Sequence, residues 1–161
     1  MNPQLPDTLP KSPPADFRRY LPLLLAMAIF MQMLDTTVLN TALPAMAADL
    51  HVSPLNMQSV IVSYALTLAL LIPLSGYLSA KFGTQKVFLV AIGLFSFGSL
   101  LCAFSPTLPM LVFSRIVQGV GGALLTPVAR LALIKSFEKS ELLRVLNFAI
   151  MPALMAPIMG P

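Results

Sequence analysis

Long stretches of apolar residues, separated by short polar connections, constrain this chain more than any other feature. A helix that crosses the hydrocarbon core of a bilayer needs about 20 residues. Five stretches reach or approach that length, at about 20–41, 57–78, 87–104, 108–131 and 145–161. The stretches are continuous rather than alternating between polar and apolar residues, which favours helices over a β-barrel. We therefore expect an all-α polytopic membrane protein with about five transmembrane helices.

The composition excludes the soluble classes of protein. Charged residues make up 10% of the 161 residues and apolar residues 57%, whereas a soluble domain carries about a quarter charged residues. This balance rules out a soluble enzyme, a nucleic-acid-binding protein and a disordered tail. The net charge of +4 does not indicate a nucleic-acid partner, because the cations flank apolar spans, as they do in membrane proteins.

The basic residues predict the orientation in the membrane. Residues 1–16 are rich in proline and lack apolar runs, so we expect a flexible cytoplasmic tail before a transmembrane region over 17–161. Lysine and arginine then occur on every second side of the predicted spans. These basic residues are Lys11, Arg18, Arg19, Lys81, Lys86, Arg130, Lys135, Lys139 and Arg144. Because basic connections stay on the cytoplasmic side, the N-terminus is predicted to be cytoplasmic.

Two ionisable residues lie inside the predicted spans, Asp35 in the first and Arg115 in the fourth. Each costs about 2.5–3.5 kcal/mol at the centre of a membrane helix, so each needs a partner or a water-filled cavity. At about 1.5 Å per residue, both lie roughly 8–10 Å from the outer face. If the two spans are neighbours, the charges can pair. Such a pair favours proton or substrate coupling, with a purely structural ion pair as the alternative.

Polar residues continue along the first span beside Asp35. Gln32, Thr36 and Asn40 are four residues apart, which predicts a polar stripe on an otherwise apolar helix. Gln118 follows the span-four arginine by three residues and lies on the same helical face. The candidate residues for proton coupling or substrate binding are therefore Asp35, Arg115, Gln32, Asn40 and Gln118.

Two further patterns concern helix packing. Gly119 and Gly122 share the helical face of the span-four arginine, where glycines let another backbone approach closely. Ser59, Ser63 and Thr67 form a weaker stripe on the second span. Serine and threonine hydroxyls often bond to carbonyls of their own helix, so we interpret this stripe as structural.

Residues of the kind that build catalytic or metal sites are scarce. Cys102 is the single cysteine and His51 the single histidine, and we interpret them as a packing residue and a solvated residue of an outer loop. The sequence contains no Cys/His/carboxylate cluster, phosphate-binding loop or nucleophile–base set. We therefore expect no metal, no cofactor and no enzymatic activity.

Four segments carry a resemblance to a known family. They are LDTTVLNTALPAMAADL (34–50), GYLSAKFGTQK (76–86), SRIVQGVGGAL (114–124) and MPALMAPIMGP (151–161). In this order and on these spans, they resemble the motifs of the fourteen-span drug:proton antiporter branch of the major facilitator superfamily. The resemblance covers essentially everything after the N-terminal tail.

The resemblance implies proton-driven efflux of small hydrophobic or cationic compounds across a bacterial inner membrane, by alternating access. Asp35 matches an acidic residue that the family is thought to use for protons or substrate. Arg115 matches an arginine proposed to tune the proton affinity of that acid. The implied partners are a small-molecule substrate, protons and the lipid bilayer.

Other matched positions are implied to serve conformational change. Gly76, Lys81 and Gly83 match a cytoplasmic loop motif, and Pro157 and Gly160 match a Gly/Pro-rich antiporter motif. The expected conformational residues, including the two glycines of span four, are Gly76, Lys81, Gly83, Gly119, Gly122, Pro157 and Gly160.

Three positions depart from the family pattern. Ala80 stands where the loop motif has an aspartate, and Thr84 replaces its usual arginine. Ala156 stands where the antiporter motif commonly has glycine. The usual charge clasp of the loop motif therefore cannot form in the same way.

The N-terminal half of a major facilitator fold has six spans built from two inverted repeats, of which this chain supplies about five. We expect the chain to be the N-terminal part of a longer transporter, with a missing C-terminal half that completes the substrate cavity. The 161 residues alone are then expected not to transport. The alternatives are a metabolite or sugar symporter of the same superfamily and a non-transporting structural membrane protein.

Overall fold

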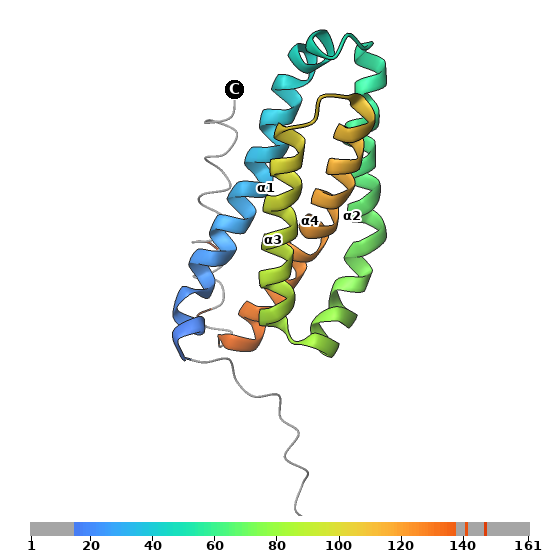
Figure 1. Ribbon diagram of the computed structural model, residues 1–161. Coiled ribbons are helices and arrows are strands. Elements are labelled where there is room, and N and C mark those ends of the chain that lie inside the picture. The colour runs from blue at the N-terminus through green and yellow to red at the C-terminus, as the bar shows by residue number, and fades with distance from the viewer. Residues whose placement is uncertain (1–14, 138–140, 142–146, 148–161) are drawn as a thin grey trace, which may run out of the picture.

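Four long α-helices form an antiparallel bundle in the computed structural model (Figure 1). The structure describes residues 15–137, 141 and 147. The helices are α1 (Ala15–Asp49), α2 (Pro54–Phe82), α3 (Thr84–Ala103) and α4 (Leu108–Ser136). Each is long and apolar enough to cross a membrane. The predicted all-α membrane fold is confirmed, whereas the predicted fifth span lies outside the described residues except for position 147.

Helix boundaries follow local backbone chemistry. Ser53 precedes α2 and its hydroxyl accepts the backbone N–H of Leu55, while Pro54 occupies the first helical position, where a missing N–H costs nothing. Gly83 alone joins α2 to α3. Its φ of 87° is a backbone conformation that residues other than glycine rarely adopt. Its N–H donates to the Ser79 carbonyl, which completes the end of α2.

The first helix is longer than the sequence predicts. It continues to Asp49 instead of ending near residue 41. The predicted end marked the length needed to cross the membrane core. Segment 42–48 is rich in alanine, which favours a helix, and the helix continues through it although it contains Pro44. The extension also packs: Leu39 and Ala47 lie in a buried cluster with Met57 of α2.

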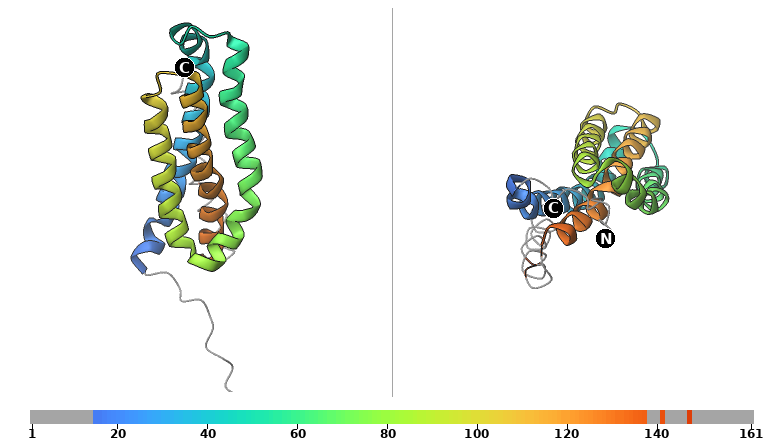
Figure 2. Two further views of the ribbon diagram at one scale, coloured as in Figure 1. Left: turned by 45° about the vertical axis from the view of Figure 1, so that its right-hand side comes forward. Right: turned by 90° about the horizontal axis from the view of Figure 1, so that it is seen from below.

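Helix α4 is the centre of the bundle and contacts all three other helices. α3 and α2 flank it, and α1 crosses it obliquely, so that the N-terminal part of α1 lies away from α2 (Figure 2). The contact between α3 and α4 brings backbones together, because a Cβ added to Gly98 would lie 2.6 Å from the Cα of Gln118. Gly121 approaches α3 equally closely, with an added Cβ 2.7 Å from the Ala91 carbonyl oxygen.

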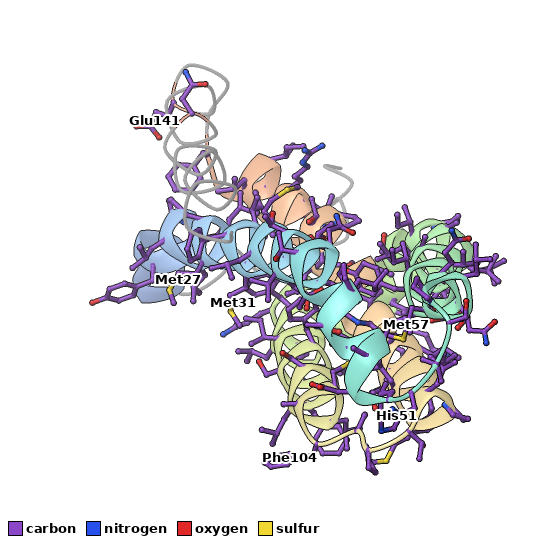
Figure 3. All side chains as sticks on the ribbon, turned by 90° about the horizontal axis from the view of Figure 1, so that it is seen from above. Met27, Met31, His51, Met57, Phe104 and Glu141 are labelled. Carbon is purple, nitrogen blue, oxygen red and sulfur yellow. The ribbon has the colours of Figure 1, made fainter. Side chains whose placement is uncertain are left out.

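Large apolar side chains cover the outside of the bundle. Leu70 of α2 and Phe97 of α3 are exposed, and Figure 3 shows Met27 and Phe104 projecting away from the helices. A water-soluble bundle would bury such residues, whereas a membrane helix presents them to lipid. The chain is therefore an integral membrane protein, and the buried polar residues of the described part include Ser114, Arg115 and Gln118 of α4.

Candidate functional site

The two ionisable residues that the sequence places inside spans meet between α1 and α4. The Arg115 Nη1 donates to the Asp35 Oδ2 at 2.7 Å. The two side chains are only 6% and 15% exposed, respectively. Because α1 and α4 run in opposite directions (Figure 1), residues far apart in sequence reach the same level. The contact has the charge-assisted geometry of a strong hydrogen bond.

Gln118 occupies the other carboxylate oxygen. Its Nε2 donates to the Asp35 Oδ1 at 2.9 Å, and its side chain is fully buried. Its own Oε1 accepts a weak hydrogen bond from the Cys102 Sγ of α3 at 3.7 Å. Both oxygens of Asp35 are thus bonded, and the acid is connected to α3 as well as to α4.

A second polar cluster surrounds Gln32, about one helical turn before Asp35. The Gln32 Nε2 donates to the Gly122 carbonyl at 3.2 Å and, at a longer 3.4 Å, to the Tyr64 hydroxyl. Its Oε1 accepts from the Thr126 hydroxyl at 2.7 Å. Gly122 leaves room for this arrangement, because a Cβ at this position would lie 2.9 Å from the Tyr64 oxygen and displace that side chain.

Tyr64 connects the two clusters. Its ring centroid lies 5.8 Å from the guanidinium carbon of Arg115, within the range of a cation–π interaction. The Arg115 Nε is buried and has no hydrogen-bond partner among the described residues. The ring of Tyr64 therefore faces a cation whose hydrogen-bonding capacity is only partly used.

Sequence reasoning missed Tyr64 and Thr126. A tyrosine in the middle of an apolar span needs a partner for its hydroxyl, and that rule alone would have singled out Tyr64. Thr126 follows Gln118 and Gly122 at intervals of four residues, so the spacing places all three near one face of α4.

The predicted polar stripe of α1 is only partly on the inner face. Gln32 and Asp35 contact α4, but Asn40 is exposed and takes no part in either cluster. Each step of four residues rotates a helix by about 40° beyond a full turn, so the stripe drifts off the contact. Thr36 is exposed as well and donates its hydroxyl hydrogen to the Gln32 carbonyl at 3.0 Å, while Thr37 does the same to Met33 at 2.9 Å.

The serine and threonine stripe of α2 behaves as predicted. Ser59 and Ser63 donate to the carbonyls three residues earlier, and Thr67 donates to the carbonyl four residues earlier. The Cβ of Thr67 also supplies the surface against which Gly119 packs, 2.9 Å from the position of an added Cβ. The hydroxyl hydrogens of all three residues are therefore bonded within α2.

An open cavity of about 470 Å³ lies beside the Gln32 cluster, between α1, α2 and α4. Most of its walls are apolar, while Gln32 and Thr126 supply uncharged polar groups and Arg130 the charge. The residues that line it are Gln32, Leu68, Ile72, Gly122, Thr126, Pro127, Arg130, Leu131 and Ile134.

The predicted conformational residues are spread over the bundle. Gly76 faces open space on α2, and Gly83 forms the turn between α2 and α3. The Lys81 Nζ lies 5.4 Å from the ring centroid of Phe82 and 5.8 Å from that of Tyr77. Pro157 and Gly160 lie outside the described residues. Within the described part of the chain, no group of three His, Cys, Asp or Glu residues is placed to hold a metal ion.

Comparison with known proteins identifies the family of this chain. The sequence profile described as Major Facilitator Superfamily matches residues 25–161. The chain belongs to the Major Facilitator Superfamily. Its buried charge pair and apolar exterior are thus those of a member of a transporter family, as the four sequence motifs predict.

Several curated relatives of this chain carry the name "Putative multidrug resistance protein MdtD". The protein from Pectobacterium carotovorum subsp. carotovorum (strain PC1) is 49% identical over 138 residues, which cover 86% of this chain and 30% of the relative. The protein from Serratia proteamaculans (strain 568) is 50% identical over 138 residues, 86% of this chain and 29% of its own length. The matched part of this chain therefore spans about 30% of the length of these relatives. The predicted resemblance is confirmed as a sequence similarity to the MdtD proteins.

Proposed function

We propose that this chain is part of a proton-coupled exporter of small hydrophobic or cationic compounds, in which Asp35 and Arg115 couple proton binding to movement of α1 against α4. The observation that carries the proposal is the 2.7 Å contact between these residues, buried between two apolar antiparallel helices. Ionisable groups inside a membrane are costly and usually functional. The names of the relatives support drugs as substrates.

The bonding of Asp35 supports exchange at a single acid. One carboxylate oxygen accepts from Arg115 and the other from Gln118, so the charge of Asp35 is what attracts both partners. A proton on Asp35 removes that charge and weakens its hold on Arg115. A cationic compound would compete with Arg115 for the same carboxylate. Proton and cation then bind alternately, which is the requirement for antiport.

The cavity beside the Gln32 cluster supports apolar substrates. Its volume of about 470 Å³ lies within the range of sites for drug-sized molecules. Leucine and isoleucine supply four of the nine residues that line it, and Gln32 belongs to the helix that carries Asp35. Because Arg130 disfavours a second cation at its end of the cavity, the charge of a cationic substrate would lie toward Asp35.

Orientation and context form part of the proposal. Lys81 and Lys86 lie near the turn between α2 and α3, at the same end of the bundle as the start of α1 (Figure 1). On the positive-inside rule, we propose that this end and the N-terminus lie on the cytoplasmic side of a bacterial inner membrane. Since the 138 matched residues cover only 30% of the relative's length, we propose that a further part of the transporter completes the substrate path.

The test is ethidium export by the longer transporter proposed to contain this chain, measured in everted membrane vesicles over a range of pH. Asp35→Asn keeps the size of the side chain but removes its charge and its proton. We expect this variant to lose pH-dependent export, because neither proton nor cation binding can then alter the contact with Arg115.

Asp49→Asn is the matched control, since Asp49 is an exposed acid at the far end of the same helix. It should export ethidium like the unmodified protein at equal amounts in the membrane. Unchanged pH-dependent export by the Asp35→Asn variant would contradict the proposal. Export that is lost equally in both variants would also contradict it.

A further inference from the structure

We propose that Tyr64 of α2 is a positioning residue of the charge pair, holding Arg115 against Asp35 through its ring and tying the pair to Gln32 of α1 through its hydroxyl. The consequence for transport rests on the proposed function. The coupling between the side chains does not, and it is measurable without any transport assay.

The ring of Tyr64 supports the guanidinium. Arg115 is 5% exposed, and its Nη1 is committed to Asp35 while its Nε has no hydrogen-bond partner among the described residues. The ring centroid at 5.8 Å supplies an attraction to the cation, and such an attraction is larger in a desolvated site than at a surface. The ring therefore limits where the guanidinium can lie.

The hydroxyl of Tyr64 reaches α1. It accepts a long hydrogen bond of 3.4 Å from Gln32, whose amide also donates to the Gly122 carbonyl. The space for this arrangement exists because position 122 lacks a side chain, and a Cβ there would lie 2.9 Å from the Tyr64 oxygen and 3.2 Å from the Gln32 nitrogen. The packing thus fixes the hydroxyl at the junction of α1, α2 and α4.

The position of Tyr64 matters because α1 and α2 have few other contacts. Tyr64 of α2 contacts Arg115, which binds Asp35 of α1. Tyr64 also contacts Gln32, one turn earlier on α1. A change in the Asp35–Arg115 contact is therefore passed to α2 through Tyr64. Removing the ring should have the same effect as removing the arginine that it positions.

Double-mutant cycles on the full-length protein in detergent test the proposal, with the thermal unfolding midpoint as the readout. Tyr64→Leu should lower the midpoint on its own, but add little in the Arg115→Met background, because interacting residues are not additive. Tyr64→Phe keeps the ring and should retain the coupling to Arg115. It lacks the hydroxyl and should lose the coupling to Gln32, which the cycle with Gln32→Met measures. Additive effects in both cycles would overturn the proposal.

Tyr77→Leu is the control, because Tyr77 is an exposed aromatic on the same helix beside Lys81. Its effect should add fully to that of Arg115→Met. Should Tyr64→Leu fail to fold, the Tyr64→Phe and Gln32→Met cycle still decides the role of the hydroxyl.

Ethidium export supplies the functional arm. At equal folded amounts, Tyr64→Leu should lower the export rate by the same factor as Arg115→Met, the double variant no further, and Tyr64→Phe should restore most of the rate. Multiplied losses in the double variant would contradict positioning. Absence of export from the unmodified protein would contradict the proposed function alone, since the unfolding cycles stand apart from it.

Discussion

At the scale of single residues, Asp35 has more hydrogen-bond partners than charge neutralisation requires. Arg115 alone would balance its charge, yet Gln118 bonds the second oxygen. In a medium with little water, an unused carboxylate oxygen costs free energy even when the charge is paired. The amide therefore contributes to the stability of the pair and keeps the carboxylate oriented between α1 and α4.

Loss of Arg115 should destabilise the fold. Arg115→Met keeps the length and apolar stem of the side chain but leaves Asp35 with an amide as its partner. Breaking a buried ion pair from one side costs about 3–5 kcal/mol, so we expect a fall of that order in the free energy of unfolding. Chemical unfolding in mixed micelles, followed by circular dichroism, measures it.

The matched control for this variant is Lys86→Met, at an exposed position on α3, which should stay within about 0.5 kcal/mol of the unmodified protein. Adding Asp35→Asn to Arg115→Met should recover part of the loss, because no uncompensated charge is then left. If Arg115→Met is as stable as the control, the pair contributes nothing to folding.

The common depth of Asp35 and Arg115 follows from the sequence, because it needs only positions along the spans and opposite helix directions. Their contact was predicted only on the condition that the two spans are neighbours. Tyr64 and Thr126 require knowledge of which helix faces which, and a single sequence does not contain it. Asn40 shows the opposite failure: its spacing of four residues is regular, but each such step turns it about 40° further around the helix, and its side chain is exposed.

At the scale of helices, glycines on different faces of α4 set its distances to the neighbours. Gly121 lies against α3, while Gly119 and Gly122 lie against α2 and Gln32. Bulky residues on these faces would push the helices apart and separate the groups of the site. Close packing by small residues is a main source of helix association in membranes.

Gly121→Ala should therefore destabilise the α3–α4 contact. The added methyl group would lie 2.7 Å from the Ala91 carbonyl oxygen and 2.8 Å from the Cα of Phe95, which are backbone atoms. Overpacking of this kind costs about 1–3 kcal/mol. The thermal midpoint of the purified protein measures the effect.

Gly93→Ala is the comparison variant on α3, since nothing lies within 4 Å of an added Cβ there. Alanine favours a helix over glycine by about 0.8–1.0 kcal/mol, so this variant should equal or exceed the unmodified protein in stability. A lower midpoint for Gly93→Ala than for Gly121→Ala would contradict the role assigned to the packed face.

The helices themselves were predictable from the apolar stretches, and their ends less so. The end of α2 at Phe82 and the start of α3 at Thr84 lie a few residues beyond the predicted spans, because hydropathy marks the membrane core and not the helix. The one-residue turn depends on Gly83, whose positive φ is a backbone property that an apolar pattern does not reveal.

At the scale of the whole molecule, the connections fall at two opposite ends of the bundle. Asp49 and His51 lie at the end where α1 passes into α2, and Gly83 and Lys86 lie at the other (Figures 1 and 3). The charge pattern assigns the basic end to the cytoplasm, and labelling can check this assignment without any knowledge of the substrate.

We expect His51→Cys and Lys86→Cys to be labelled from opposite sides of the membrane. The experiment uses a Cys102→Ser background and a membrane-impermeant maleimide. Added to spheroplasts, the maleimide should label position 51. Position 86 should react only in everted vesicles, because both positions are exposed but lie at opposite ends of the helices. The reverse pattern would overturn the proposed orientation.

Thr36 and Thr37 of α1 give their hydroxyl hydrogens back to carbonyls of the same helix. The exposed Thr36 thus presents a methyl group and a hydroxyl whose hydrogen is already bonded within the helix. A lipid tail or an aromatic ring would meet a surface with no free hydroxyl hydrogen at this position, one residue away from Asp35. Apolar molecules can therefore approach the carboxylate of Asp35 without displacing water from a free hydroxyl hydrogen of Thr36.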